Sequence, residues 1–141
     1  MGYWLRIRGD RDLPGRRDLD PVEIPELLAH VVLMDVATDP LDFRYRLVGT
    51  MVDFHLHRPL TGAWVSQVPH QRAGSVFWAT MESVVRERRP VVSNIPYVGP
   101  HKDFTSIEDL IMPLSADGQT VDMLFITVAF YNRTTGLADR S

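Results

Sequence analysis

Cysteine is absent from this sequence of 141 residues, and long hydrophobic runs and a strong net charge are missing as well. Without thiols the chain can form no disulfide, no thiolate metal site and no cysteine nucleophile. No apolar run approaches the roughly 18 residues that a membrane-spanning helix needs. Residues 1–8 lack the apolar segment of a signal peptide. We therefore expect a cytoplasmic protein that does not associate with membranes.

The small net charge excludes one further class of partner. It is formally -3, and the arginines near the N-terminus are interleaved with aspartates, so local charge nearly cancels. Such a chain has no long-range attraction for nucleic acid, and we expect no nucleic-acid partner. The length and the 45% content of hydrophobic residues fit one folded domain. We place an N-terminal arm at 1–20, the domain at 21–131 and a C-terminal tail at 132–141.

The spacing of hydrophobic residues predicts helices and strands along most of the domain. Apolar residues at helical spacing predict a long helix from about Pro69 to Arg88, which Pro90 ends. The other predicted elements are a short broken helix over 21–30, a short helix over 51–57, and strands over 31–37, 42–48, 91–98, 107–114 and 120–131. Strands and helices are segregated along the chain. The predicted fold class is therefore α+β, a five-stranded antiparallel sheet with one long helix and several short helices on one face.

The last predicted strand is apolar on both of its faces, whereas an antiparallel sheet with one face in water alternates apolar and polar residues. Both faces therefore need a cover, and the helices supply only one. We predict that the N-terminal arm covers part of the second face and that another copy of the chain, in a homodimer, covers the rest. The residues assigned to this arm or dimer face are Trp4, Leu124, Ile126, Val128 and Phe130.

Several short motifs occur in an order that resembles a PAS domain. Near the C-terminus, Pro113-Leu114 and an Asp117-Gly118 turn lead into the long apolar strand, as at the end of many PAS domains. A closer similarity is to a small stand-alone bacterial PAS family. The motifs that carry it are Trp4, Pro14-Gly15-Arg16, Asp20-Pro21, Arg46-Leu47-Val48-Gly49-Thr50 and Thr61-Gly62. The segment His57-Arg58-Pro59-Leu60 departs from that family, which often has Gly-Arg before Thr-Gly.

The resemblance implies a sensory or regulatory module in signal transduction that is not an enzyme. The chain carries no kinase, cyclase or DNA-binding segment, so we expect the output to pass through a separate signalling protein or the dimer. PAS domains hold small molecules, or nothing, between the sheet and the long helix. On this resemblance the pocket residues are Phe54, Phe77, Trp78, Met81, Asn94, Leu110, Met112, Phe125 and Thr127. Most of them can equally fill a core, and we expect a cavity of small or zero size.

Two other chemistries remain open at this point. Haem sites in PAS domains use a histidine near the long helix, which makes His70 the residue to test, although we expect no metal or cofactor. A cone-shaped α+β enzyme or carrier of the isomerase kind would need a buried carboxylate beside a tyrosine such as Tyr45. The candidate carboxylates are Asp35, Asp53, Glu108 and Asp109, which we expect to be solvated. Burial at a pocket with a raised pKa would distinguish a catalytic acid.

Overall fold

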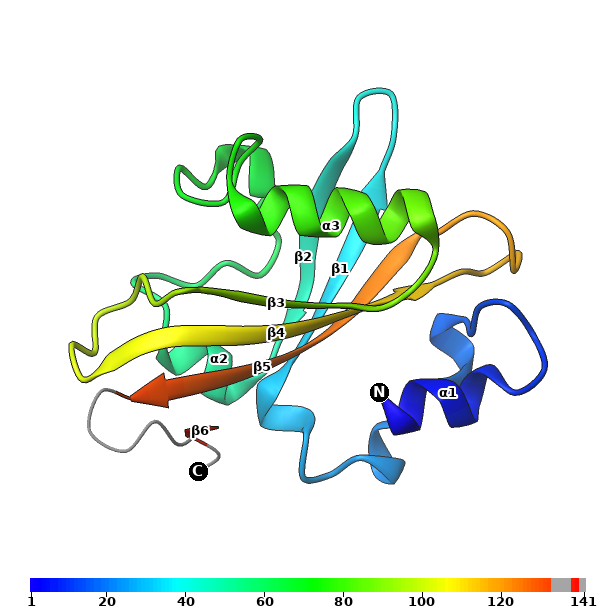
Figure 1. Ribbon diagram of the computed structural model, residues 1–141, viewed down its shortest axis with the longest axis horizontal. Helices are drawn as coiled ribbons and strands as arrows, with labels where there is room; N and C mark the ends of the chain where they lie inside the picture. Colours follow the sequence, from blue (N-terminus) through cyan, green and yellow to red (C-terminus); the bar gives the residue numbers. More distant parts are fainter. Residues whose placement is uncertain (133–137, 140–141) are drawn as a thin grey trace.

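The computed structural model describes residues 1–132 and 138–139. Five long strands form one antiparallel sheet in the order β2-β1-β5-β4-β3 (Figure 1). They are β1 (Val31–Ala37), β2 (Asp42–Val48), β3 (Val91–Pro96), β4 (Phe104–Leu114) and β5 (Met123–Asn132). The two-residue strand β6 (Ala138–Asp139) pairs with β5. The predicted α+β class and the five-stranded antiparallel sheet are confirmed.

The long helix is shorter than predicted. Helix α3 spans Val76–Glu87, whereas the apolar spacing predicts a start near Pro69. Gly74 has a φ of +102°, in the left-handed region that glycine tolerates, so the preceding residues form turns. Ser75 then caps the helix, because its hydroxyl accepts a hydrogen bond from the backbone N–H of Trp78 at 3.1 Å. Local turn chemistry therefore overrides the apolar spacing in the first part of the predicted helix.

The remaining helical segments are short. Helix α2 (Thr50–Phe54) occupies the first part of the predicted helix over 51–57. In place of the broken helix over 21–30 there are two 3₁₀ turns. The short segments not predicted as such are helix α1 (Gly2–Arg8) in the N-terminal arm and two more 3₁₀ turns. The four 3₁₀ turns are η1 (Arg16–Asp18), η2 (Pro21–Glu23), η3 (Leu28–His30) and η4 (Val65–Gln67).

The turn before β5 explains why that strand starts three residues later than predicted. The side chain of Asp117 accepts hydrogen bonds from the backbone N–H groups of Gln119 and Thr120, both at 2.8 Å. These bonds to the charged form lower the pKa of Asp117 to about 2. The carboxylate thereby holds the chain in a turn beyond Gly118, and ladder pairing begins only at Met123.

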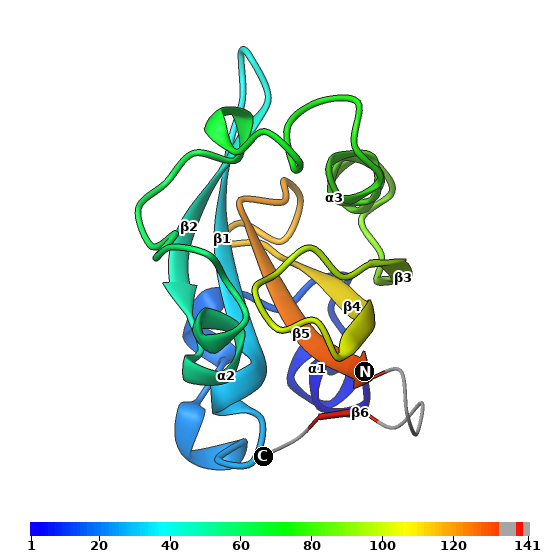
Figure 2. The same cartoon turned by 90° about the vertical axis from the view of Figure 1, so that its left-hand side faces the viewer.

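The sheet separates two layers of different origin, as Figures 1 and 2 show. Helix α3 packs on one face, which we call the inner face, against β3 and β4. Helix α1 lies on the opposite, outer face, where the ring of Tyr3 meets Phe125 edge-on at 6.4 Å. Trp4 is 2% exposed, and its Nε1 donates a hydrogen bond to the backbone oxygen of Pro113 at 2.8 Å. The predicted cover of one face by the N-terminal arm is confirmed, with Trp4 as its anchor.

The predicted assignment of the last strand's residues to the two faces is wrong. Ile126, Val128 and Phe130 line a cavity on the inner face, and Leu124, which shares their face of β5, is fully buried. Period-two alternation groups residues that share a face, but it does not say which face meets which helix. The reason given for a homodimer, that these residues would otherwise be open to water, does not hold. The homodimer itself stays a prediction.

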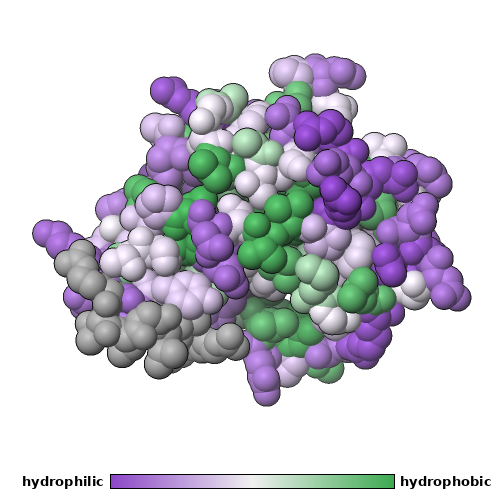
Figure 3. All heavy atoms as spheres, viewed as in Figure 1, coloured by the Kyte–Doolittle hydropathy of each residue, from purple (hydrophilic) through white to green (hydrophobic). Residues whose placement is uncertain are grey.

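The surface in Figure 3 carries several separate hydrophobic patches among hydrophilic side chains, not one continuous apolar face. In the described ranges, 1–132 and 138–139, no helix has both the length and the hydrophobicity required to cross a membrane.

Candidate ligand-binding cavity

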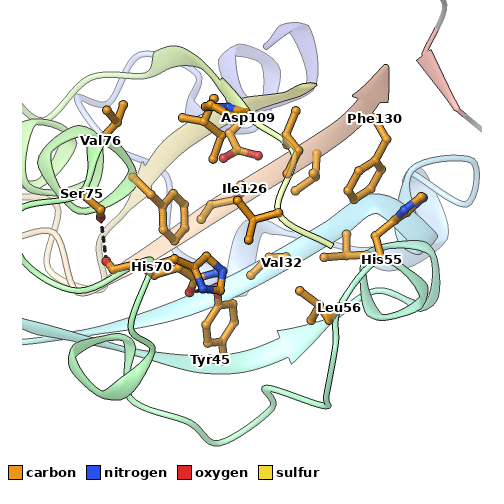
Figure 4. Close-up of a pocket in the computed structure, with 18 residues that line it drawn as sticks. Val32, Tyr45, His55, Leu56, His70, Ser75, Val76, Asp109, Ile126 and Phe130 are labelled. Atoms are coloured by element: carbon orange, nitrogen blue, oxygen red, sulfur yellow. Dashed lines mark hydrogen bonds between the residues drawn. The ribbon is translucent and has the colours of Figure 1, made fainter. Parts of the chain in front are cut away.

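A cavity of about 220 Å³ lies between the inner face of the sheet and the segments around α2 and α3 (Figure 4). Its walls are mainly apolar. The strands contribute Val32, Ile95, Ile107, Ile126, Val128 and Phe130. Helix α3 and the region of α2 contribute Val76, Phe77, Val52 and Leu56. The sequence predicts a small cavity or none, and the structure has a small one.

The structure brings few of the predicted pocket residues to this cavity. Of the nine, Phe77 lies on its wall. Trp78 and Met81 are buried beside it in α3 but do not line the space, and Trp78 packs edge-on against Phe43 at 5.0 Å. Phe54 is 55% exposed and Asn94 is exposed as well. The other four side chains point to the outer face, away from the cavity, because they alternate along their strands with cavity-lining residues. They are Leu110, Met112, Phe125 and Thr127.

Asp109 is buried, and the prediction from the sequence that its carboxyl group is solvated is wrong. Asp109 is 4% exposed and lines the cavity. Figure 4 shows its carboxyl group pointing into the space, on the side opposite Tyr45. The signal was present in β4, where Ile107, Asp109 and Ile111 alternate with residues of the outer face. Applying the strand's period of two to Asp109 would have placed it among apolar neighbours.

The surroundings of Asp109 disfavour its charged form. Burial raises its pKa to about 7, and the nearby charge of Glu108 adds to the rise. The residue directly opposite on β3 is Ser93, which carries no charge. Within the described residues, the Asp109 carboxyl group takes part in no hydrogen bond and no ion pair. The carboxyl group therefore faces the cavity with its hydrogen-bonding capacity open to whatever molecule enters the space.

The polar groups across the cavity, in contrast, are paired with one another. The hydroxyl of Tyr45 donates a hydrogen bond to Oε1 of Gln71 at 2.6 Å. The hydroxyl of Ser75 donates to the backbone oxygen of Gln71 at 2.9 Å. Burial raises the pKa of Tyr45 well above its usual value, in opposition to the hydrogen bond with Gln71, which lowers it, and with a further rise from the charge of Asp109. Tyr45 is therefore a neutral, engaged donor at physiological pH.

An aromatic group closes the far end of the cavity. The ring of His55 stacks on Phe130 at 3.8 Å between centroids, and His55 is 2% exposed. Its Nδ1 lies 2.9 Å from the hydroxyl oxygen of Tyr97, at hydrogen-bonding distance. Phe104 packs edge-on against the same imidazole at 4.5 Å. His55 is not among the pocket residues predicted from the sequence, because only the tertiary fold brings the end of α2 beside Phe130 of β5.

A comparison with protein families matches this chain, over residues 1–127, to the family described as PAS domain. The chain belongs to the PAS domain family. No curated protein and no solved structure matches it. The match supports the resemblance at the level of the PAS domain, and the narrower stand-alone bacterial family stays a prediction.

The match covers the N-terminal arm of this PAS domain as well as its sheet up to Thr127 in β5. The arm is joined to the body by a hydrogen bond from the N–H of Ser115 to the backbone oxygen of Pro14 at 2.8 Å. A Cβ on Gly15 would lie 2.9 Å from the Ser115 oxygen, which explains glycine there. The boundaries at 1–20, 21–131 and 132–141 stay predictions, and most of the last segment lies outside the described residues.

His70, the residue singled out for a haem test, lies exposed at the rim of the PAS cavity. Partial burial lowers its pKa, and the nearby His57 lowers it further. A space of 220 Å³ is below the roughly 300–1,000 Å³ of sites for drug-sized molecules, and a porphyrin is larger still. In the part of the chain that the structure describes, no three His, Asp or Glu side chains are grouped so that they could hold a metal ion.

Proposed function

We propose that this PAS domain binds a small molecule in the inner-face cavity and signals its presence to a protein partner, without catalysing a reaction. Membership of the family supports a sensory or regulatory role in general. The finer claim, that a ligand occupies this cavity, rests on the size and the lining of the space.

The volume of the cavity is the observation that carries the proposal. Protein interiors are close-packed and leave few voids larger than a water molecule. Here about 220 Å³ is open between apolar walls. An engineered apolar cavity of about 150 Å³ already binds benzene. The space is therefore large enough for a small organic ligand, which distinguishes this proposal from a pure interaction module with a filled core.

The position of the cavity mouth supports transmission to a partner. Val76 at the start of α3 is 60% exposed and Val98, after β3, is 49% exposed, and both line the cavity. A ligand that contacts these two side chains from within also acts on a surface that a partner protein can reach. The partner, the homodimer and the cytoplasmic location stay predictions.

Native mass spectrometry of the purified protein, followed by denaturing mass spectrometry of any released compound, tests the proposal. The variant Val32→Phe fills the cavity from β1, and Val92→Phe on the exposed outer side of β3 is its matched control. We expect a bound small molecule, or stabilisation by small apolar compounds, in the wild type and the control but not in Val32→Phe. Equal behaviour of all three proteins would overturn the proposal.

A second candidate function, the isomerase-like enzyme, is favoured by one observation. Asp109 meets the criterion set for a catalytic acid, because it is buried at a pocket and its pKa is raised to about 7. Its carboxylate would take a proton from a carbon next to a carbonyl group and return it to another carbon of the same substrate. This function ranks second because Tyr45, the candidate donor to the enolate oxygen, already donates its proton to Gln71.

Incubation with a β,γ-unsaturated cyclic ketone in D₂O tests the second function by NMR. An isomerase would produce the conjugated ketone with deuterium incorporated, and Asp109→Asn would abolish this conversion. We expect the same rate with protein as with buffer alone. Conversion that depends on Asp109 would favour the isomerase function over ligand sensing.

A further inference from the structure

Asp109 is the buried polar residue of the cavity whose side chain has no hydrogen bond to any described residue. The hydroxyl groups of Tyr45 and Ser75 both donate hydrogen bonds to Gln71. The Nδ1 of His55 lies at hydrogen-bonding distance from the hydroxyl of Tyr97. No residue in the described ranges bonds to the carboxyl group of Asp109, although that residue is 4% exposed. Because the carboxyl group faces the cavity without a protein partner, a ligand that supplies donors can form hydrogen bonds with it and displace no protein contact.

The charge of the cavity selects the kind of donor. Among the residues that the structure describes, no lysine or arginine lines the space, and Asp109 is the sole carboxylate that does. His70 at the rim has a lowered pKa, so it is neutral at neutral pH and does not compensate a negative charge. An anionic ligand would meet only repulsion from Asp109, whereas an ammonium group would form a charge-assisted hydrogen bond with it.

The size of the cavity and its apolar walls define the rest of the ligand. At the packing density of a protein interior, about 0.75, 220 Å³ holds a molecule of roughly ten non-hydrogen atoms. Phe77 and Phe130 offer aromatic surface, and Ile126 lies between Asp109 and Tyr45 in Figure 4. The body of the ligand must therefore be apolar, with one polar end.

We propose that the cavity selects small apolar amines, bound as ammonium ions with Asp109 as their counter-ion. This inference rests on the proposed function, since it names the ligand class of the same cavity. The ammonium lies at the β4 side of the space, and the apolar body extends toward the aromatic end at His55 and Phe130.

The proposal makes binding depend on pH in a defined direction. With a pKa of about 7, Asp109 is about one-tenth ionised at about pH 6 and nine-tenths ionised at about pH 8. Alkylamines stay protonated over this range, so their affinity rises about tenfold from pH 6 to pH 8. The other titratable groups around Asp109 are Glu108 on β4, Tyr45 on β2, and the ring nitrogens of His55 and His70 at the two ends of the cavity.

Isothermal titration calorimetry with three probes of similar shape tests the proposal. They are 2-phenylethylamine, the uncharged 2-phenylethanol and the anionic phenylacetate. The proteins are the wild type, Asp109→Asn, and the control Glu108→Gln, which removes the neighbouring carboxylate on the outer face of β4. Because Asn keeps the shape of Asp and removes a buried charge, we expect Asp109→Asn to fold.

In the wild type at about pH 8 we expect the amine to bind about tenfold or more tighter than the alcohol, and phenylacetate to bind weakest. Asp109→Asn should remove the preference and leave the affinity for the alcohol within about twofold, whereas Glu108→Gln should retain the preference. Equal affinity for amine and alcohol, or an amine preference that survives in Asp109→Asn, would overturn the amine proposal while leaving a ligand-binding cavity. If none of the three probes binds at millimolar concentration, the amine proposal fails. The proposed function fails with it only if wild type, Val32→Phe and Val92→Phe also behave alike in the ligand test above.

Discussion

The two faces of the central sheet are buried in different ways. On the outer face, helix α1 brings Trp4 against the sheet, and the indole N–H bonds to the backbone of Pro113. On the inner face, α3 and the region of α2 leave about 220 Å³ open, with Asp109 unpaired at its wall. The part of the outer face beneath α1 is closed by the chain's own side chains and stabilises the fold, whereas the inner face has a cavity that a ligand can fill. The difference distinguishes the region of this PAS domain that stabilises the fold from the region that we propose binds a ligand.

Removing the anchor of the outer face should have the largest effect. Trp4→Ala takes away a fully packed indole and leaves the Pro113 oxygen without its donor. We expect a loss of about 3–5 kcal/mol in the free energy of unfolding, measured by urea denaturation. Leu5→Ala is the control on the same helix, because Leu5 is 44% exposed, and it should change stability by less than about 0.5 kcal/mol. Similar small losses for both would mean that α1 does not seal the sheet.

On the inner face, removing the buried charge of Asp109 should increase the free energy of unfolding instead of lowering it. Asp109 has a pKa of about 7 in the folded protein, above that of an unfolded chain. Between about pH 4 and pH 7 the unfolded state releases this proton while the folded state retains it, so Asp109 destabilises the fold increasingly as the pH rises. Asp109→Asn should therefore stabilise by about 2–4 kcal/mol near pH 8 and by almost nothing near pH 3.5.

Thermal unfolding of wild type and Asp109→Asn at matched pH values measures this difference. Asp53→Asn, at an exposed position of α2, is the control and should show no such trend. A stability difference between wild type and Asp109→Asn that is the same at every pH would contradict the burial of the charge in an apolar space.

Adjacent residues of β1 allow the two faces to be compared with one substitution. Val32 lines the cavity, while Val31 points to the other side of the strand and is 3% exposed. Val31→Phe should cost about 1–3 kcal/mol because it overpacks a filled region. Val32→Phe should cost less than about 1 kcal/mol because the ring enters existing space. Denaturant midpoints of the two variants check this order, and the reverse order would show that the cavity is not open.

The smallest effect is expected at the cap of the helix that covers the cavity. The hydroxyl of Ser75 accepts a hydrogen bond from the N–H of Trp78 and donates one to the Gln71 oxygen. Ser75→Ala should destabilise by about 1 kcal/mol, the usual cost of losing an N-cap. Ser83→Ala, on the exposed side of α3, is the matched control and should have a smaller effect. Equal effects in thermal unfolding would show that the cap does not define the start of α3.

The fold was accessible from the sequence to a greater extent than the site. Strands 31–37 and 42–48 have the predicted bounds, because alternation and turn residues are local signals. The start of α3 was misplaced because a capping serine after Gly74 competes with the apolar periodicity. The faces of β5 were exchanged because the identity of the covering layer depends on contacts far apart in sequence.

The pocket residues were missed for the same reason. His55, Gln71 and Asp109 come from three separate segments, and nothing local to His55 or Gln71 indicates a cavity. Asp109 alone had a usable local signal, since Ile107 and Ile111 flank it on its face of β4. A charged residue within an apolar alternation marks either an exposed edge or a functional group, and the neighbouring strands decide between the two.

The pH dependence of ligand binding and the preference for amines both depend on the protonation state of Asp109. NMR titration of the ¹³C-labelled aspartate carboxyl groups, with Asp109→Asn to assign the signal, measures it directly. A midpoint at about pH 7 in the free protein, falling when 2-phenylethylamine is added, is the predicted result. A midpoint near the ordinary value for aspartate, unchanged by the amine, would place Asp109 in water and contradict the account.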